Sequence, residues 1–180
     1  MVGDVERVSA QSSTFTRERS TPEGMRDVTV DEASSALLRF SSGAAGTLEV
    51  GRTAVRRPCD MTVEVNGTRG TLAFDYSRLN ELRYGCDGED AQLYGMRTIR
   101  AEYAGHPYAA HWWPIGQGVG YGSSFVNQVA ELLGSWPEGP WSPDFRQGQR
   151  VQAICEATER SAERQEWVEV SEVDRVLEDV

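Results

Sequence analysis

Alternation of apolar and polar residues with a period of two constrains the fold of this chain most. Residues 61–65 alternate cleanly, and Asn66 and Gly67 follow as residues that tolerate the positive φ of a tight hairpin turn before a return strand over 70–75. Further strands are predicted over residues 5–15, 33–40, 46–53 and 80–84. Short turns join these strands, and parallel neighbours would need long crossovers, so the sheet is predicted to be antiparallel.

Helical spacing replaces this alternation later in the chain. Residues 122–133 carry apolar side chains at i, i+3 and i+4, which predicts an amphipathic helix. A second helix is predicted from about Asp144 to Arg164, with Val151, Ile154, Cys155 and Thr158 along its apolar side. Residues 167–170 are predicted as a last strand, and the polar residues 17–27 as an exposed loop.

Strands followed by helices predict an α+β domain, with a predominantly antiparallel, open-faced sheet and helices packed on one face. We expect residues 1–170 to form this domain and residues 171–180 to be an exposed acidic tail. Val, Leu and Phe fall on both faces of the predicted sheet, so its free face is expected to bury against another copy in a homo-oligomer.

Composition excludes several kinds of partner. The formal net charge of −10 and a pI near 4.7 argue against nucleic acid and against an anionic membrane surface. The three cysteines, Cys59, Cys86 and Cys155, include no CxxC pair and are expected to be reduced thiols in a cytoplasmic protein. All 18 basic residues are arginine, so this chain supplies no lysine acid, base or Schiff base.

Residues 106–125 are the strongest candidate for a functional site. This segment holds both histidines, two adjacent tryptophans and four glycines at every second position. Flat aromatic walls beside imidazoles and an amide suit a small polyhydroxylated ligand. His106 and His111 are the candidate acid/base residues, because an imidazole titrates near neutrality. The candidate substrate-binding residues are Tyr108, Trp112, Trp113, Gln117, Tyr121 and Arg52.

Neither a cofactor nor a metal site is predicted in this chain. The glycines at 116, 118, 120 and 122 do not match the G-x-G-x-x-G dinucleotide fingerprint in either register. His106 and His111 lack the further Cys, His or carboxylate ligands at recurring spacing that metal sites usually show. Without another protein, the site is therefore expected to bind neither NAD(P) nor a metal ion.

Several ordered motifs resemble one family of oxidoreductases. They are residues 31–50, residues 65–74, residues 79–82, the Trp113-Pro114 step with its glycine run, and residues 143–145. In this order they resemble the second domain of the glucose-fructose oxidoreductase / inositol dehydrogenase / MocA (Gfo/Idh/MocA) family. The resemblance covers about residues 1–170.

The resemblance implies the α+β architecture and a division of labour between two domains. In that family a Rossmann domain binds NAD(P), and the second domain shapes the pocket for a sugar, polyol or related cyclic alcohol and carries the oligomer interface. Hydride transfer is assisted by a lysine of the first domain and an Asp/His pair just before the second, and none of these positions exists here. The family often has a histidine where this chain has Gln117, and glutamine cannot relay a proton at neutral pH.

Three functions stay open from the sequence. The first is a substrate-binding and oligomerisation domain that needs a separate Rossmann domain or subunit for NAD(P)-dependent chemistry. The second is a cofactor-independent lyase, isomerase or cyclase that uses His106 or His111 as acid/base. The third is a non-catalytic scaffold subunit.

Overall fold

A computed structural model describes residues 2–57, 59–88, 90–135 and 143–173 of the chain. Its contacts divide the chain into two compact units. Unit 1 is Met1–Val55 with Ser142–Val180, and unit 2 is Arg56–Trp141. Both units contain antiparallel strands and helices, which confirms the predicted α+β class.

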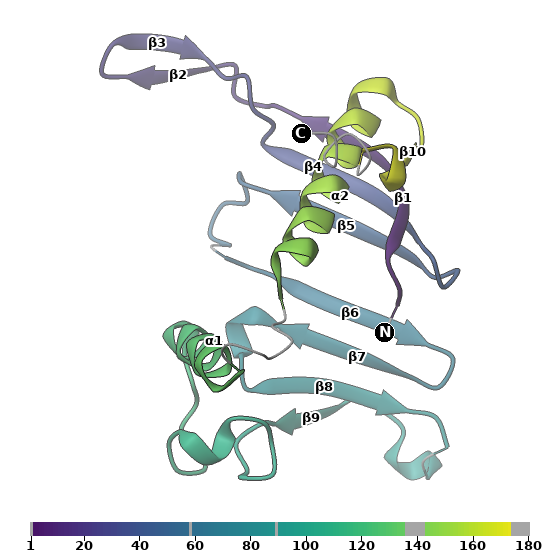
Figure 1. The fold of residues 1–180 in the computed structure, drawn as a ribbon, viewed down its shortest axis with the longest axis vertical. Coiled ribbons are helices and arrows are strands. Elements are labelled where there is room, and N and C mark those ends of the chain that lie inside the picture. The colour runs from purple at the N-terminus through teal and green to yellow at the C-terminus, as the bar shows by residue number, and fades with distance from the viewer. Residues whose placement is uncertain (1, 58, 89, 136–142, 174–180) are drawn as a thin grey trace. The chain divides into compact units, whose positions relative to one another are not determined.

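Unit 1 contains a four-stranded antiparallel sheet with one helix across it (Figure 1). The strand order is β10–β1–β4–β5, formed by Val168–Glu169, Val5–Ser13, Ala33–Phe40 and Ala45–Gly51. The predicted strands over 33–40 and 46–53 match β4 and β5 closely. These two strands pair with each other in an unbroken antiparallel register. Helix α2 (Phe145–Arg164) begins after Asp144, whose side chain accepts the Gln147 N–H as an N-cap.

The core of unit 1 lies between α2 and β1. Ala153, Ala157 and Ser161 are fully buried and recur every fourth residue, so they form one side of the helix. The predicted apolar side is wrong for Val151, which is 61% exposed, and for Cys155, which is exposed, whereas Ile154 is partly buried against the core as predicted. Small side chains allow the helix backbone to approach the sheet closely, so burial follows size here rather than hydrophobicity.

Two details strengthen this packing. The Ser161 hydroxyl accepts the Ala10 N–H at 2.9 Å and donates to the Glu166 carbonyl at 2.5 Å, so it joins β1 to the end of α2. Val173 is fully buried against the same core. The start of the expected exposed tail therefore belongs to the core, and residues 174–180 lie outside the described residues.

Residues 17–27 were expected to be a loop and form a hairpin instead. Strands β2 (Glu18–Thr21) and β3 (Gly24–Asp27) pair with each other in a sheet of their own, which projects as an arm (Figure 1). Nearly all their side chains are exposed, so no apolar alternation marks these strands in the sequence. At the base of the arm, Glu32 accepts the backbone N–H groups of Phe15 and Thr16.

Unit 2 contains a second four-stranded antiparallel sheet in the order β6–β7–β8–β9. The strands are Thr62–Gly67, Gly70–Asp75, Glu81–Cys86 and Arg97–Arg100, and the last was not predicted. The predicted turn is also shifted, because Gly67 pairs with Gly70 and Thr68 and Arg69 make the turn. Asn66 therefore lies inside β6, opposite Thr71.

One face of the unit 2 sheet is apolar and only partly covered. Val63, Phe74, Leu82 and Ile99 lie opposite one another across the four strands, and directly opposed residues share a face. Val63 is 51% exposed and Ile99 is 39% exposed. Among the described residues of this unit no apolar side chain is fully buried. Unit 2 thus keeps an accessible apolar surface in this chain.

Candidate functional site

The candidate site segment is a series of tight turns that leads into α1 (Tyr121–Ser135). The N–H of His106 bonds to the Tyr103 carbonyl at 2.8 Å. A short 3-10 helix, η3 (Ala109–His111), follows directly. These turns place several large aromatic residues on one short stretch of backbone. The whole segment belongs to unit 2.

Two aromatic side chains of this segment are held by polar residues of α1. The Tyr108 hydroxyl donates to Glu131 Oε1 at 2.7 Å, and Trp112 Nε1 donates to Asn127 Oδ1 at 2.9 Å. Asn127 and Glu131 are four residues apart, so they lie on the same side of the helix. One helix side therefore orients two of the predicted substrate-binding residues.

Tyr108 also adopts a strained backbone. Its φ of 64° is in the left-handed region, which is uncommon for a residue with a bulky side chain. Strain of this kind persists only where the surroundings enforce it, and it occurs often at functional sites. The hydrogen bond to Glu131, burial and the carboxylate charge raise the pKa of the Tyr108 phenol. The phenol thus stays protonated and able to donate.

Glu102 holds the part of the site segment where the glycine run begins. It follows β9, and its side chain is only 5% exposed. Oε2 accepts the backbone N–H of Gly116 at 3.1 Å, while Oε1 forms an ion pair with Arg100 at 2.7 Å. The start of the glycine run is therefore tied to the sheet edge.

Tyr121, the first residue of α1, makes two ring contacts. Its ring lies edge-on to Tyr76 with centroids 6.1 Å apart, and edge-on to Phe125 at 5.0 Å. Burial, followed by the nearby Tyr121 and Cys59, raises the pKa of the Tyr76 phenol. The three rings form a continuous aromatic surface at the start of the helix.

The remaining candidates in unit 2 are more accessible. Trp113 is 59% exposed, and His111 and Gln117 are exposed. His106 is half-buried beside Tyr103, with ring centroids 6.3 Å apart, and its Nδ1 atom is buried without a hydrogen-bond partner. The acid/base role of both histidines stays a prediction.

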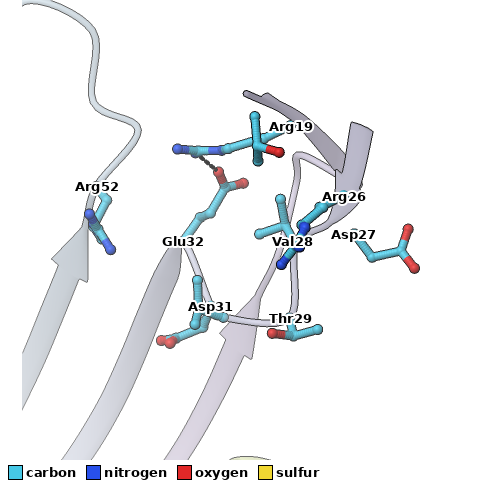
Figure 2. Close-up of a pocket in the computed structure, with 10 residues that line it drawn as sticks. Arg19, Arg26, Asp27, Val28, Thr29, Asp31, Glu32 and Arg52 are labelled. Atoms are coloured by element: carbon cyan, nitrogen blue, oxygen red, sulfur yellow. Dashed lines mark hydrogen bonds and ion pairs between the residues drawn. The ribbon is translucent and has the colours of Figure 1, made fainter. Parts of the chain in front are cut away.

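Arg52 belongs to unit 1 and is separate from this group. Its N–H donates to the Glu32 carbonyl at 2.8 Å, and it lines a cavity of about 320 Å³ at the base of the arm. Figure 2 shows Arg19 over Glu32 in this cavity, with Arg52 just beyond the end of the neighbouring strand β5. The Thr16 N–H above all, with Arg19 and Phe15, lowers the Glu32 pKa from 4.5 to about 2, against the effect of burial. This carboxylate is already satisfied by its own chain.

Sequence reasoning missed three residues that position the site: Glu102, Asn127 and Glu131. The latter two carry a recognisable signal, because they are polar residues four apart on the side of the helix opposite its apolar side. Glu102 carries no such signal, since its partner Gly116 is set by the path of the loop.

The glycine run does not fit a dinucleotide. The fingerprint needs a parallel strand before the loop, and the strands of unit 2 pair antiparallel. A Cβ atom on Gly118 would come within 2.8 Å of Asn80 Nδ2, so packing against Asn80 accounts for that glycine. Within the described ranges there is also no cluster of three or more His, Cys, Asp or Glu suited to a metal ion. No helix in those ranges is long and apolar enough to cross a membrane.

Chemically, the described residues suit recognition of a polyol. Exposed aromatic rings can cover the apolar C–H faces of a sugar ring, while imidazole, amide and phenol groups bond to hydroxyls. The anchoring by Asn127, Glu131 and Glu102 pre-organises the loop, which reduces the entropy lost on binding.

Comparison with known proteins bears on the family. The family model for the GFO/IDH/MocA C-terminal domain matches the sequence over residues 1–73. Levoglucosan dehydrogenase from Pseudarthrobacter phenanthrenivorans is 32% identical over 189 residues, which cover 96% of this chain and 48% of that protein. The chain therefore spans about half the length of this curated relative.

Solved structures agree over nearly the whole chain. An oxidoreductase domain protein from Kribbella flavida matches with a TM-score of 0.88 at 35% identity, covering 92% of this chain and 46% of its own. Levoglucosan dehydrogenase in complex with NADH and L-sorbose matches with a TM-score of 0.87 at 34% identity, covering 93% and 45%. An NAD binding oxidoreductase from Klebsiella pneumoniae matches with a TM-score of 0.86 at 32% identity, covering 93% and 46%. These matches confirm the resemblance that the sequence motifs indicated.

Proposed function

We propose that the chain is the substrate-binding, C-terminal domain of a GFO/IDH/MocA-type oxidoreductase for a sugar, polyol or related cyclic alcohol, because the family model of that C-terminal domain matches residues 1–73. NAD(P) is held by a separate Rossmann domain or subunit. The carrying observation is the match to levoglucosan dehydrogenase with NADH and L-sorbose, which covers 93% of this chain but only 45% of that enzyme.

The residues of this chain bind and orient the substrate. Trp112, Trp113 and Tyr121 offer aromatic faces. The Tyr108 phenol donates its hydrogen to Glu131, so its oxygen can accept a hydrogen bond from a substrate hydroxyl. When bound by the other domain, NAD(P) would supply the hydride acceptor for the alcohol carbon that these residues orient. The chain has no lysine, so a lysine that takes the hydroxyl proton must come from that other domain.

Isothermal titration of the 180-residue protein with levoglucosan and with L-sorbose tests the substrate class. Saturable binding that is lost in Trp113→Ala is the expected result. Trp167→Ala is the matched control, because Trp167 is a partly exposed tryptophan of unit 1 that stacks with Arg7. Equal loss in both variants, or no binding of either sugar, would contradict the proposed function.

We also propose that the apolar face of the unit 2 sheet forms the homo-oligomer interface. The ladder of Val63, Phe74, Leu82 and Ile99 supports this, because exposed contiguous apolar surface marks interaction sites. Val63→Glu is expected to shift the protein to a smaller species in sedimentation velocity. Val50→Glu, of similar exposure in unit 1, should leave the species unchanged. A wild-type monomer at micromolar concentration would refute the interface.

A further inference from the structure

Helix α1 has its apolar side exposed, although the helices were expected to pack on one face of the sheet. At the helical period, Phe125, Val126, Val129 and Leu133 lie on the side opposite Asn127 and Glu131. We name these four residues the α1 stripe, and they are 51%, 56%, 53% and 70% exposed, respectively. The helix thus contacts its own loop through polar residues and presents its apolar side outward.

The α1 stripe is continuous with the candidate site. Phe125 belongs to the stripe, and its ring contacts Tyr121, a predicted substrate-binding residue, at 5.0 Å. Glu131 is the one charged residue between Tyr121 and Ser135, and it bonds to Tyr108 on the opposite side. An uncharged, apolar surface therefore begins at the site and extends along the helix.

We propose that the α1 stripe is the docking face for the dinucleotide-binding domain, whether that domain is a neighbouring segment or a separate polypeptide. The inference rests on the proposed function. Hydride transfer requires the reacting atoms to come within about 3–3.5 Å of each other. A domain that brings the nicotinamide to a substrate held beside Tyr121 must therefore touch the margin of the site. The stripe is the apolar surface found there, and desolvating it favours association.

The length of the relatives supports this occupant over others. The chain covers 46% of the NAD binding oxidoreductase from Klebsiella pneumoniae and 48% of levoglucosan dehydrogenase. More than half of each relative thus lies outside the match and is available to cover such a surface. Interfaces between domains of one enzyme typically bury several hundred square ångströms on each side.

A binding experiment without substrate tests the docking face directly. The probe is the half of the Pseudarthrobacter levoglucosan dehydrogenase that lies outside the match, made as a separate chain and loaded with NADH. Its NADH fluorescence is followed while the 180-residue protein is added up to about 100 μM, a range that detects weak interfaces. Saturable association is expected, and Val129→Glu should weaken it by about tenfold or more.

Val50→Glu is the matched control, because Val50 and Val129 are both 53% exposed and the charge change is the same. Circular dichroism confirms that both variants are folded. Absence of association, or equal weakening in both variants, overturns the docking face. Loss of self-association in Val129→Glu without the probe assigns the stripe to a second copy and also overturns it. Failure of sugar binding in the separate titration refutes the proposed function and leaves this readout unchanged.

Discussion

The hydrogen bond between Trp112 and Asn127 gives a quantitative prediction for the site. Trp112 Nε1 donates to Asn127 Oδ1 at 2.9 Å, in a partly buried place, and this bond holds the indole in one orientation. Asn127→Leu keeps the approximate size of the side chain and removes the acceptor. The indole is then free to adopt other rotamers.

The expected loss of affinity follows from the fraction of molecules in which the Trp112 ring is correctly oriented. A neutral hydrogen bond contributes about 1 kcal/mol net, so its loss reduces the oriented fraction about fivefold. Ligand that binds only the oriented form then has an apparent Kd about fivefold higher. Asn127→Asp retains an acceptor at the same position, and the added charge four residues from Glu131 costs only about 0.2–0.5 kcal/mol.

Isothermal titration with levoglucosan compares the two variants. We expect an approximately fivefold higher Kd for Asn127→Leu and a Kd within about twofold of wild type for Asn127→Asp. Gln128→Leu, the same change on the adjacent helical residue, controls for altered helix propensity. Equal affinities for Asn127→Leu and Asn127→Asp would show that ring orientation does not govern binding.

Three further predictions concern stability and titration. The Glu32 pKa is lowered to about 2, chiefly by the Thr16 N–H, so the stability that ionised Glu32 gives the fold is complete above about pH 4.5 and is lost as the pH falls toward 2. The urea midpoint of Glu32→Gln should therefore fall less than that of the wild type over this pH range. The same fall in both proteins would refute this role of Glu32. Val8 is fully buried, so Val8→Ala should lower the free energy of unfolding by about 2–3 kcal/mol in urea titrations, and a change below about 0.5 kcal/mol would contradict the assigned core. Because the bond to Glu131 raises the pKa of Tyr108, alkaline ultraviolet titration of Tyr108→Phe should lose a late-titrating tyrosine, whereas an unchanged late component would rule out this assignment.

Much of the fold was predictable because period-two patterns survive where a strand has one buried side. Strand β4 matches its predicted range, because Ala36 and Leu38 are on its less exposed side while Leu37 between them is exposed. The β2–β3 arm was missed for the complementary reason, since a hairpin with both faces exposed has no apolar alternation. The turn after β6 was misplaced because strand pairing through Gly67 and Gly70 determined its position, over the local preference of Asn66.

The candidate site was predictable in its residue types but not in its anchors. The aromatic residues and histidines between 106 and 125 are contiguous in the sequence, so composition revealed them. Their orientation depends on contacts across longer separations, such as Tyr108 to Glu131 and Glu102 to Gly116. The exposure of Val129 was also unpredicted, because an apolar helical side indicates burial but not whether the covering surface belongs to the same chain.

Nicotinamide reduction in a reconstituted mixture tests whether this chain is the substrate-binding half of a two-domain oxidoreductase. Levoglucosan and NAD⁺ are incubated with the 180-residue protein, with the NAD-binding half of levoglucosan dehydrogenase, and with both. NADH absorbance is expected to rise only when both are present. NADH formation by the 180-residue protein alone, or conversion of the sugar by it without any nicotinamide, would contradict the proposed function.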